Sequence, residues 1–189
     1  MKFKKIIIIT SVALALTIAG YMYEDSKVTF ADLDAMPVSH KSLSELEGRS
    51  KLIISGRPTA SENHIIRDEE GFTKEAYTIT NFEIEHVYDS KLGSQLKDGD
   101  VIRVAEPVYL LDNGIKPGKT QFAIEGYEPM EKKKRYLLVL KTDQNYSDLY
   151  DIVGVNDGKY SLDSTDQKIN LGEKAGKFKD ELINKYMIK

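Results

Sequence analysis

Hydrophobic and polar positions change their pattern twice along the chain. Residues 6–23 form a run of 18 residues without a charged side chain, and this run follows Lys2, Lys4 and Lys5. A helix of that length measures about 27 Å, close to the ~30 Å hydrocarbon layer of a bilayer. Lysines before an apolar run are typical of a signal peptide or a signal anchor. The sequence therefore predicts that residues 1–23 target the chain to a cell membrane.

Two fates of this segment stay open. Thr17 and Ala19 are small residues that suit cleavage by a signal peptidase, and cleavage would release a secreted protein. Tyr21 and Tyr23 stand where the aromatic belt of a retained anchor would stand. In both cases the lysines remain inside, and everything after the segment is expected on the outer side of the membrane.

A spacer and a short helix are expected next. Residues 24–41 have mixed polarity and no sustained period, which is typical of a spacer. Ser42 or Ser44 suits the N-cap of a helix that covers residues 42–48, because Glu45 follows Ser42 three residues later and Gly48 can end the helix. The predicted folded domain therefore covers residues 42–189.

From residue 51 the period changes to that of β-strands. Residues 59–71 are polar and are expected to form a loop. The apolar phase of the long extended stretch switches near Asn81, which predicts either a β-bulge or a strand that is buried on both sides at different points. The expected strands cover residues 52–56, 72–88, 101–104, 108–111, 121–124 and 136–140.

The last part of the chain predicts a hairpin and a helix. Asn156, Asp157 and Gly158 separate apolar residues 150–155 from residues 159–162, a pattern typical of a tight turn with positive φ at the glycine. Residues 172–188 place Phe178 and Leu182 on one face of an amphipathic helix, and lysines occupy the opposite face.

Short, regularly spaced strands with a helix at each end indicate a mainly β fold, namely a small antiparallel barrel. The succession of residues 52–56, 77–79, 82–84, 96–104, 136–140 and 150–155 resembles that of uncharacterised exported Gram-positive proteins with an OB-fold-like β-barrel domain. The resemblance covers about residues 50–163. It implies an OB-like barrel, to which the sequence patterns add a short N-terminal helix and a C-terminal amphipathic helix, and it implies no catalytic residue.

Composition narrows the class of protein further. The chain has no cysteine, which excludes disulfides and thiolate metal sites and suits an exported bacterial protein. Setting aside the first 20 residues with their three lysines leaves 24 basic and 30 acidic residues, a net charge of −6. An acidic domain has no electrostatic footprint for nucleic acid. Nucleic acid is therefore not an expected partner.

Candidate catalytic chemistry is sparse. His40, His64 and His86 have no partner at the spacing of metal ligands, and no serine stands in the context of an activated nucleophile. His64 precedes the acidic residues 68–70, which leaves a weak metal site as the minor alternative. We expect no metal, no cofactor and no catalytic residue.

Tyrosine is the more suggestive residue type. The chain has 11 tyrosines and no tryptophan. Tyr109, Tyr127, Tyr146 and Tyr150 fall near predicted strand ends or loops and could form a stacking platform for a sugar or a peptide. The alternative is that tyrosine simply suits the pleated, half-buried surface of a strand. These four tyrosines are the predicted ligand-binding residues.

Three functions follow from these patterns, and the third of them is a structural subunit or immunity-type protein whose C-terminal helix docks on a partner. The first is a non-enzymatic extracytoplasmic module that binds an envelope component or another exported protein and contacts the membrane through its N-terminal helix. The second is a hydrolase of the cell wall or of extracellular polymers. A binding module needs an exposed cleft or an aromatic patch, whereas an enzyme needs a pocket where carboxylates or histidines converge.

Overall fold

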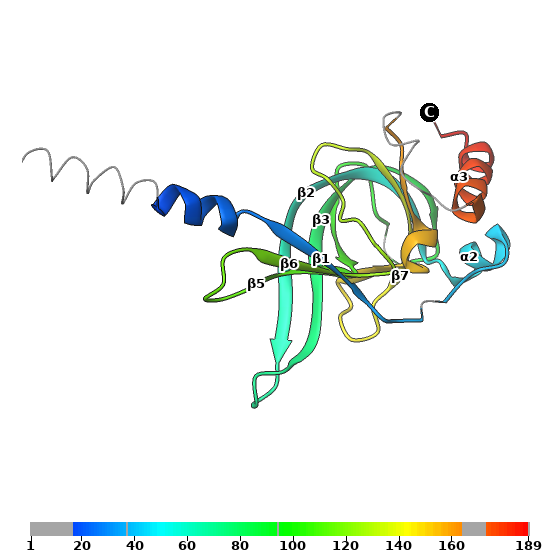
Figure 1. The fold of residues 1–189 in the computed structure, drawn as a ribbon. Helices are drawn as coiled ribbons and strands as arrows, with labels where there is room; N and C mark the ends of the chain where they lie inside the picture. Colours follow the sequence, from blue (N-terminus) through cyan, green and yellow to red (C-terminus); the bar gives the residue numbers. More distant parts are fainter. Residues whose placement is uncertain (1–16, 37, 94, 164–172, 189) are drawn as a thin grey trace, which may run out of the picture. The chain divides into compact units, whose positions relative to one another are not determined.

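A computed structural model describes residues 17–36, 38–93, 95–163 and 173–188, and in it the chain is mainly β. The chain divides into two compact units. The first combines the described residues up to 32 with residues 110–122, and the second contains the described residues of 33–109 and 123–188. The strands, shown in Figure 1, are β1 (Val28–Leu33), β2 (Leu52–Arg67), β3 (Thr73–Ser90), β4 (Val101–Glu106), β5 (Val108–Asp112), β6 (Lys119–Ile124), β7 (Tyr136–Thr142), β8 (Leu149–Ile152) and β9 (Lys159–Ser161). The helices are α2 (Leu43–Arg49), the 3-10 turn η1 (Val155–Gly158) and α3 (Glu173–Tyr186).

The first unit contains helical residues 17–25 and most of a three-stranded sheet in the order β1-β6-β5. The loop between β5 and β6 is bonded to the end of this helix. The Gly118 N–H donates to the Asp25 carboxylate at 3.2 Å, and the Lys119 N–H donates to the Lys27 carbonyl at 2.9 Å. Gly118 has a φ of +101°, and a Cβ there would lie 3.3 Å from the Lys27 carbonyl oxygen. Only glycine satisfies both conditions without strain.

The second unit is built on a six-stranded sheet in the order β2-β3-β4-β8-β7-β9, in which β2 also pairs with β7. The pairs β2–β3, β3–β4, β7–β8, β7–β9 and β2–β7 are antiparallel, and β4–β8 is parallel. The β2–β7 register sets Leu52 opposite Leu140 and Gly56 opposite Tyr136.

The core of the second unit lies on both sides of β2 and β7. Side chains of a strand point alternately to its two faces, so a strand buried on both faces reads as a continuous apolar run. In β7, Leu138 and Leu140 belong to one buried cluster, whereas Leu137 and Val139 belong to a second. The second cluster is covered by Leu46 of α2 and by Ala175, Phe178 and Leu182 of α3, two helices that lie side by side in Figure 1.

Both predicted helices with described residues are confirmed. Ser42 is the N-cap of α2, and its hydroxyl accepts from the Glu45 N–H at 3.2 Å. The helix continues through Gly48 and ends at Arg49. In α3, Phe178 and Leu182 are buried as the amphipathic pattern predicts. The range predicted as a spacer, residues 24–41, contains strand β1.

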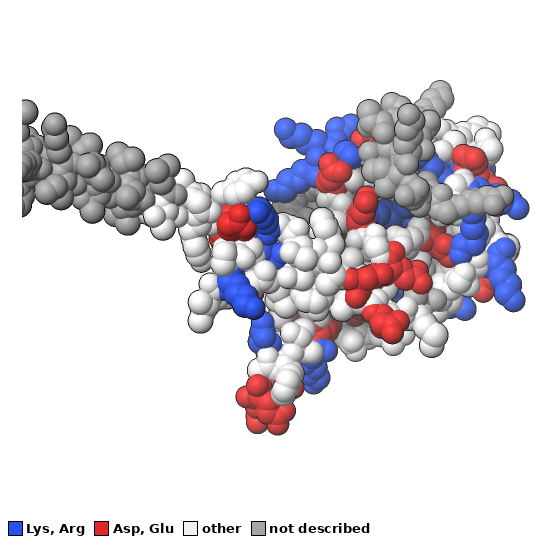
Figure 2. Space-filling view, in the orientation of Figure 1, with Lys and Arg blue, Asp and Glu red and all other residues white. Residues whose placement is uncertain are grey.

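The predicted loop at residues 59–71 is wrong, because β2 continues to Arg67 and pairs with β3 along its length. Only a tight turn separates the strands, where the Asp68 carboxylate accepts the N–H groups of Glu70 and Phe72. This part of β2 is largely exposed, so its sequence lacks the apolar alternation that marks a half-buried strand. Acidic side chains gather at the tip of the β2–β3 hairpin (Figure 2).

A bulge does accompany the phase switch near Asn81. Pro58 pairs with Phe82 and Ala60 pairs with Asn81, so Thr59 is the extra residue, and it lies in β2 rather than in β3. An extra residue reverses which face later side chains occupy.

The predicted hairpin at residues 156–158 is also wrong. Strands β8 and β9 do not pair with each other, since both pair with β7, and residues 155–158 form η1 between them. The positive φ falls on Gly154 at 67° and on Val155 at 55° instead of on Gly158. Position 158 has no room for a side chain, because a Cβ there would lie 2.4 Å from the Val153 carbonyl oxygen and 2.9 Å from that of Val139.

The predicted membrane segment lies mostly in residues 1–16, outside the described residues. Among the residues that are described, no helix is both long enough and apolar enough to cross a bilayer.

Gly158→Ala tests the role of close packing at this turn. The new methyl group would press on two backbone carbonyls, so we expect a loss of about 1–3 kcal/mol in the free energy of unfolding, measured with urea. Gly48→Ala is the matched control, because a Cβ at Gly48 meets nothing within 4 Å and alanine favours a helix. The control should be neutral or stabilising; equal stability of the two variants would contradict this packing.

Candidate functional site

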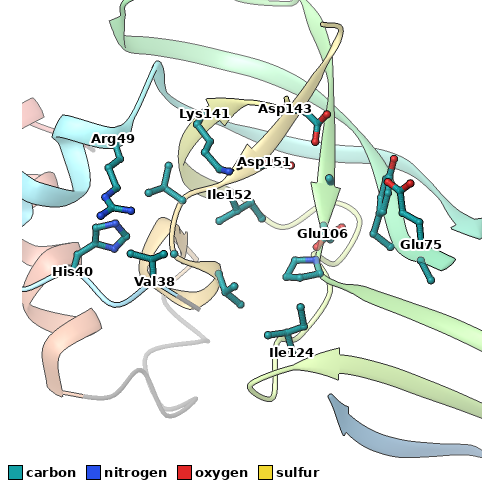
Figure 3. Close-up of a pocket in the computed structure, with 17 residues that line it drawn as sticks. Val38, His40, Arg49, Glu75, Glu106, Ile124, Lys141, Asp143, Asp151 and Ile152 are labelled. Atoms are coloured by element: carbon teal, nitrogen blue, oxygen red, sulfur yellow. Dashed lines mark ion pairs between the residues drawn. The ribbon is translucent and has the colours of Figure 1, made fainter. Parts of the chain in front are cut away.

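The second unit contains a cavity of about 420 Å³ (Figure 3). It is surrounded by residues from α2 and the segment before it, from β3, β4, β6, β7 and β8, and from the loops that follow β4, β7 and β8. They are Val38, His40, Arg49, Glu75, Ala76, Tyr77, Ala105, Glu106, Pro107, Ile124, Lys141, Asp143, Asp151, Ile152, Val153, Gly154 and Val155.

The strand register brings the polar residues of the cavity together. Asp151 of β8 pairs with Lys141 on its antiparallel neighbour β7 and with Ala105 on its parallel neighbour β4. The Lys141 ammonium lies 3.0 Å from the Asp151 carboxylate. Burial raises the pKa of the Asp151 carboxyl group, Lys141 opposes that rise, and the neighbouring carboxyl group of Asp143 adds to it.

Asp143 begins the loop that follows β7. Its carboxylate accepts the N–H groups of Asn145 at 2.7 Å and Tyr146 at 2.8 Å, which fixes the loop beside the cavity. Figure 3 places Asp143 and Glu75 at one end of the cavity and Arg49 and His40 at the other. The cavity is therefore acidic at one end.

Tyr77 lines the acidic end of the cavity, and His64 and Tyr146 are neighbouring rings that do not line it. The Tyr77 ring lies 4.7 Å from the His64 ring, and the Tyr146 ring lies 6.3 Å from the same histidine in an edge-to-face arrangement. Burial raises the pKa of the Tyr77 hydroxyl to about 12, and Glu75 makes the next largest contribution. Tyr77 is thus a half-buried ring in a negative environment, the kind of surface that attracts a cation.

Glu106 is a fully buried carboxylate at the wall of the cavity. It accepts the hydroxyl of Thr80, the hydroxyl of Tyr127 at 2.8 Å and the N–H of Met130 at 2.7 Å. Because these donors satisfy both of its oxygens, Glu106 fastens residues 127–130 to β3 and β4. This role is structural.

His40 is buried at the opposite end. Its Nδ1 lies 3.2 Å from the Asp157 carboxylate, which also accepts the His40 N–H and lies 3.0 Å from the Lys174 ammonium. A carboxylate can only accept, so Nδ1 carries a proton and donates it. Nε2 is then an acceptor when the ring is neutral, and no described residue hydrogen-bonds to it. Asp157 thereby joins the segment before α2, η1 and α3.

The four predicted tyrosines do not form a surface platform. Tyr127 is 1% exposed and Tyr150 is 9% exposed, so both rings belong to the core. Tyr109 is half-buried on β5, and Tyr146 is 37% exposed. Of the four, Tyr146 is the one that the structure brings beside the acidic end of the cavity, through its contact with His64.

Tyr127 has partners within the protein for both its hydroxyl and its ring. Its hydroxyl is bonded to Glu106, and the Lys159 ammonium lies 3.8 Å from the centre of its ring. Burial lowers the pKa of this lysine to about 8, while Glu106 and Glu128 oppose the change. The ring and its hydroxyl are thus both engaged within the protein.

The minor alternative of a metal at His64 receives no support from the geometry. Its ring packs on Tyr77, and the Asp68 carboxylate closes the hairpin turn. Among the described residues, no group of three or more histidine or acidic side chains is arranged to hold a metal ion.

Sequence reasoning missed Tyr77, Glu75, Asp143 and Asp151 as neighbours in one cavity. They come from two strands, β3 and β8, and from the loop after β7, so no spacing in the chain marks them. No family model matches this chain, and no curated protein matches its sequence.

Glu106→Gln tests the buried acceptor. The amide offers one oxygen in place of two and sets its NH2 group against donors, so we expect a loss of roughly 2–4 kcal/mol in the free energy of unfolding. Glu83→Gln is the control, because Glu83 is an exposed carboxylate on β3 and should change stability by about 0.5 kcal/mol or less. Equal effects in chemical denaturation would refute the structural role of Glu106.

Proposed function

We propose that this protein is a non-enzymatic extracytoplasmic binding module, exported or anchored by its N-terminal segment, and that its cavity binds a ligand with a cationic group on an apolar body. The observation that carries the proposal is the joint presence of Tyr77, Glu75 and Asp143 at one end of a single cavity. Carboxylates beside an aromatic face are the combination that recognises ammonium groups in proteins.

The charged side chains that line the cavity support the binding of a cationic group. Lys141 is neutralised by Asp151 at 3.0 Å, and Glu106 is occupied by its three donors. Glu75 and Asp143 then remain as the negative charges nearest Tyr77, whose raised pKa has both of them among its causes. A ligand ammonium between them would gain two opposite charges in a partly desolvated site.

The remaining wall of the cavity supports a ligand whose body is apolar. Ile124, Ile152, Val153 and Val155 contribute hydrocarbon side chains to its wall. Pockets of about 300–1,000 Å³ with apolar walls and a few polar groups are typical of small-ligand sites. The volume suits a short side chain, a small amine or the terminal group of a polymer.

We propose further that the second unit is an OB-like barrel. The support is the order β2-β3-β4-β8-β7 together with the additional β2–β7 pairing and the parallel β4–β8 pair. The resemblance to uncharacterised exported Gram-positive proteins agrees with this arrangement. Ligands of such barrels bind at a strand face or between the loops at the barrel's mouth.

Placement outside the membrane rests on the sequence. Lys2, Lys4 and Lys5 before the uncharged residues 6–23 favour a membrane partner and an outward-facing domain. An envelope component or another exported protein would then supply the cationic group. The acidic composition of the domain argues against a nucleic acid.

A hydrolase is the second candidate, and one observation favours it: the carboxyl groups of Asp143 and Asp151 interact within the cavity, and the pKa of Asp151 is raised. Two carboxyl groups in direct contact are closer than the ~5 Å that a retaining glycosidase requires. Lys141 also occupies Asp151. Binding therefore agrees better with the geometry.

Titration of the full-length chain in detergent with hexyltrimethylammonium and with hexanoate tests the ligand class. We expect saturable binding of the cation in calorimetry and much weaker binding of the anion. Glu75→Gln and Asp143→Asn should each weaken the binding of the cation about 3–10-fold, because each substitution removes one attractive charge at a partly exposed site. Glu83→Gln on the same strand β3 should leave the affinity unchanged, since this side chain does not line the cavity.

Preference for hexanoate, or an equal loss in the Glu83→Gln control, would refute the cationic ligand. Release of soluble fragments from purified cell-wall polymer, abolished by Asp143→Asn or Asp151→Asn, would establish the hydrolase in place of the binding module.

A further inference from the structure

The first unit carries large apolar side chains on its surface. In helical residues 17–25, Ile18 and Tyr21 are each 52% exposed, and Met22 and Tyr23 are each 66% exposed. In Figure 2 this helix is mostly white where it follows the grey residues. Large exposed apolar side chains gathered in one small unit are unusual for a surface that faces only water.

Two further positions in the same unit share this property. Phe30 of β1 is 75% exposed, and Ile115 in the loop between β5 and β6 is 99% exposed. Val28 is 40% exposed, two residues before Phe30, and side chains two residues apart share one face of a strand. The unit therefore exposes two large apolar side chains on one face of β1, which continues to Asp32, and one more in the loop between β5 and β6.

The loop that carries Ile115 is held against the chain at the end of the helix. Gly118 and Lys119 donate their N–H groups to Asp25 and Lys27, as described above. The loop is closed at its base by the Asn113 N–H, which donates to the Gly118 carbonyl at 3.2 Å. Ile115 is thus carried by a loop fixed to the chain just after helical residues 17–25.

We propose that the apolar surface of the first unit, formed by Tyr21, Tyr23, Val28, Phe30 and Ile115, docks on a phospholipid bilayer. The sequence argues for lipid as the occupant, because the chain before residue 17 continues without a charge back to Ile6. Tyrosines just after such a run are typical of the membrane–water interface. A single apolar side chain at a loop tip inserts into fluid lipid without requiring a complementary pocket.

Charge plays a small part in this docking. The described residues of the first unit carry Lys27, Lys116 and Lys119 against Glu24, Asp25, Asp32 and Asp112. The near balance predicts contact with zwitterionic lipid, driven by burial of apolar side chains, and little dependence on anionic lipid or salt. The inference rests on the proposed placement at a membrane and is independent of the cavity and its ligand.

The absence of tryptophan from the chain makes a direct test possible. Ile115→Trp and Phe30→Trp each introduce a single tryptophan into the full-length chain, which is reconstituted in phosphatidylcholine vesicles with brominated acyl chains. Bromine quenches tryptophan only at close range, so we expect quenching of both variants by about twofold or more relative to unbrominated vesicles. Thr29→Trp is the matched control, because Thr29 is the neighbour of Phe30 and points to the opposite face of β1.

Strong quenching at positions 30 and 115, weak quenching at position 29 and no change on adding phosphatidylglycerol would support the docking surface. Vesicles that float without the protein would refute the placement at a membrane. Protein that floats with the vesicles while positions 30 and 115 stay unquenched would overturn this inference alone. Cross-linking through Ile115→Cys that rises with protein density would assign the surface to a second copy instead.

Discussion

Burial of β7 on both faces is the constraint on which the second unit depends. Residues 136–140 are all buried, and they alternate between a cluster that includes Phe82 and Ile84 and a cluster closed by α2 and α3. Strand β7 also pairs with β2, β8 and β9. Each fully buried large apolar side chain contributes about 1.5–3 kcal/mol, so a one-residue shift of this strand would exchange two complete sets of contacts.

The cavity lies at the end of the buried run of β7. Beyond Leu140 the strand becomes half-exposed at Lys141, and the carboxylates that line the cavity beside it are those of Asp143 in the loop and Asp151 on the paired strand β8. Of the ligand site that we propose, Asp143 therefore extends from the end of the most deeply buried strand, whereas Glu75 and Tyr77 lie on the part of β3 before its pairing with β4. A rigid strand with polar residues at its end is a suitable support for a binding site.

Local patterns predicted the elements that bury a regular face. The run at residues 136–140 and the stripe of Phe178 and Leu182 were sufficient to place β7 and α3. The exposed half of β2 escaped prediction because both of its faces meet water, so its sequence carries no period. The turn at residues 155–158 was not predicted correctly, because the sequence does not distinguish a glycine that avoids a clash with neighbouring backbone from one that adopts a positive φ. The cavity escaped because strand order, which sets Lys141 and Ala105 beside Asp151, is a long-range property.

Native-state hydrogen exchange of the full-length chain tests most directly the claim that β7 and its pairing with β2 hold the second unit together. The amides of residues 137–140 and 52–54 should exchange only through global unfolding, so their opening free energies should equal the total stability. The arm formed by residues 64–67 of β2 and 73–77 of β3, which lies beyond the pairing of β3 with β4, should open locally at lower free energy. Faster exchange in β7 than in that arm would contradict the account.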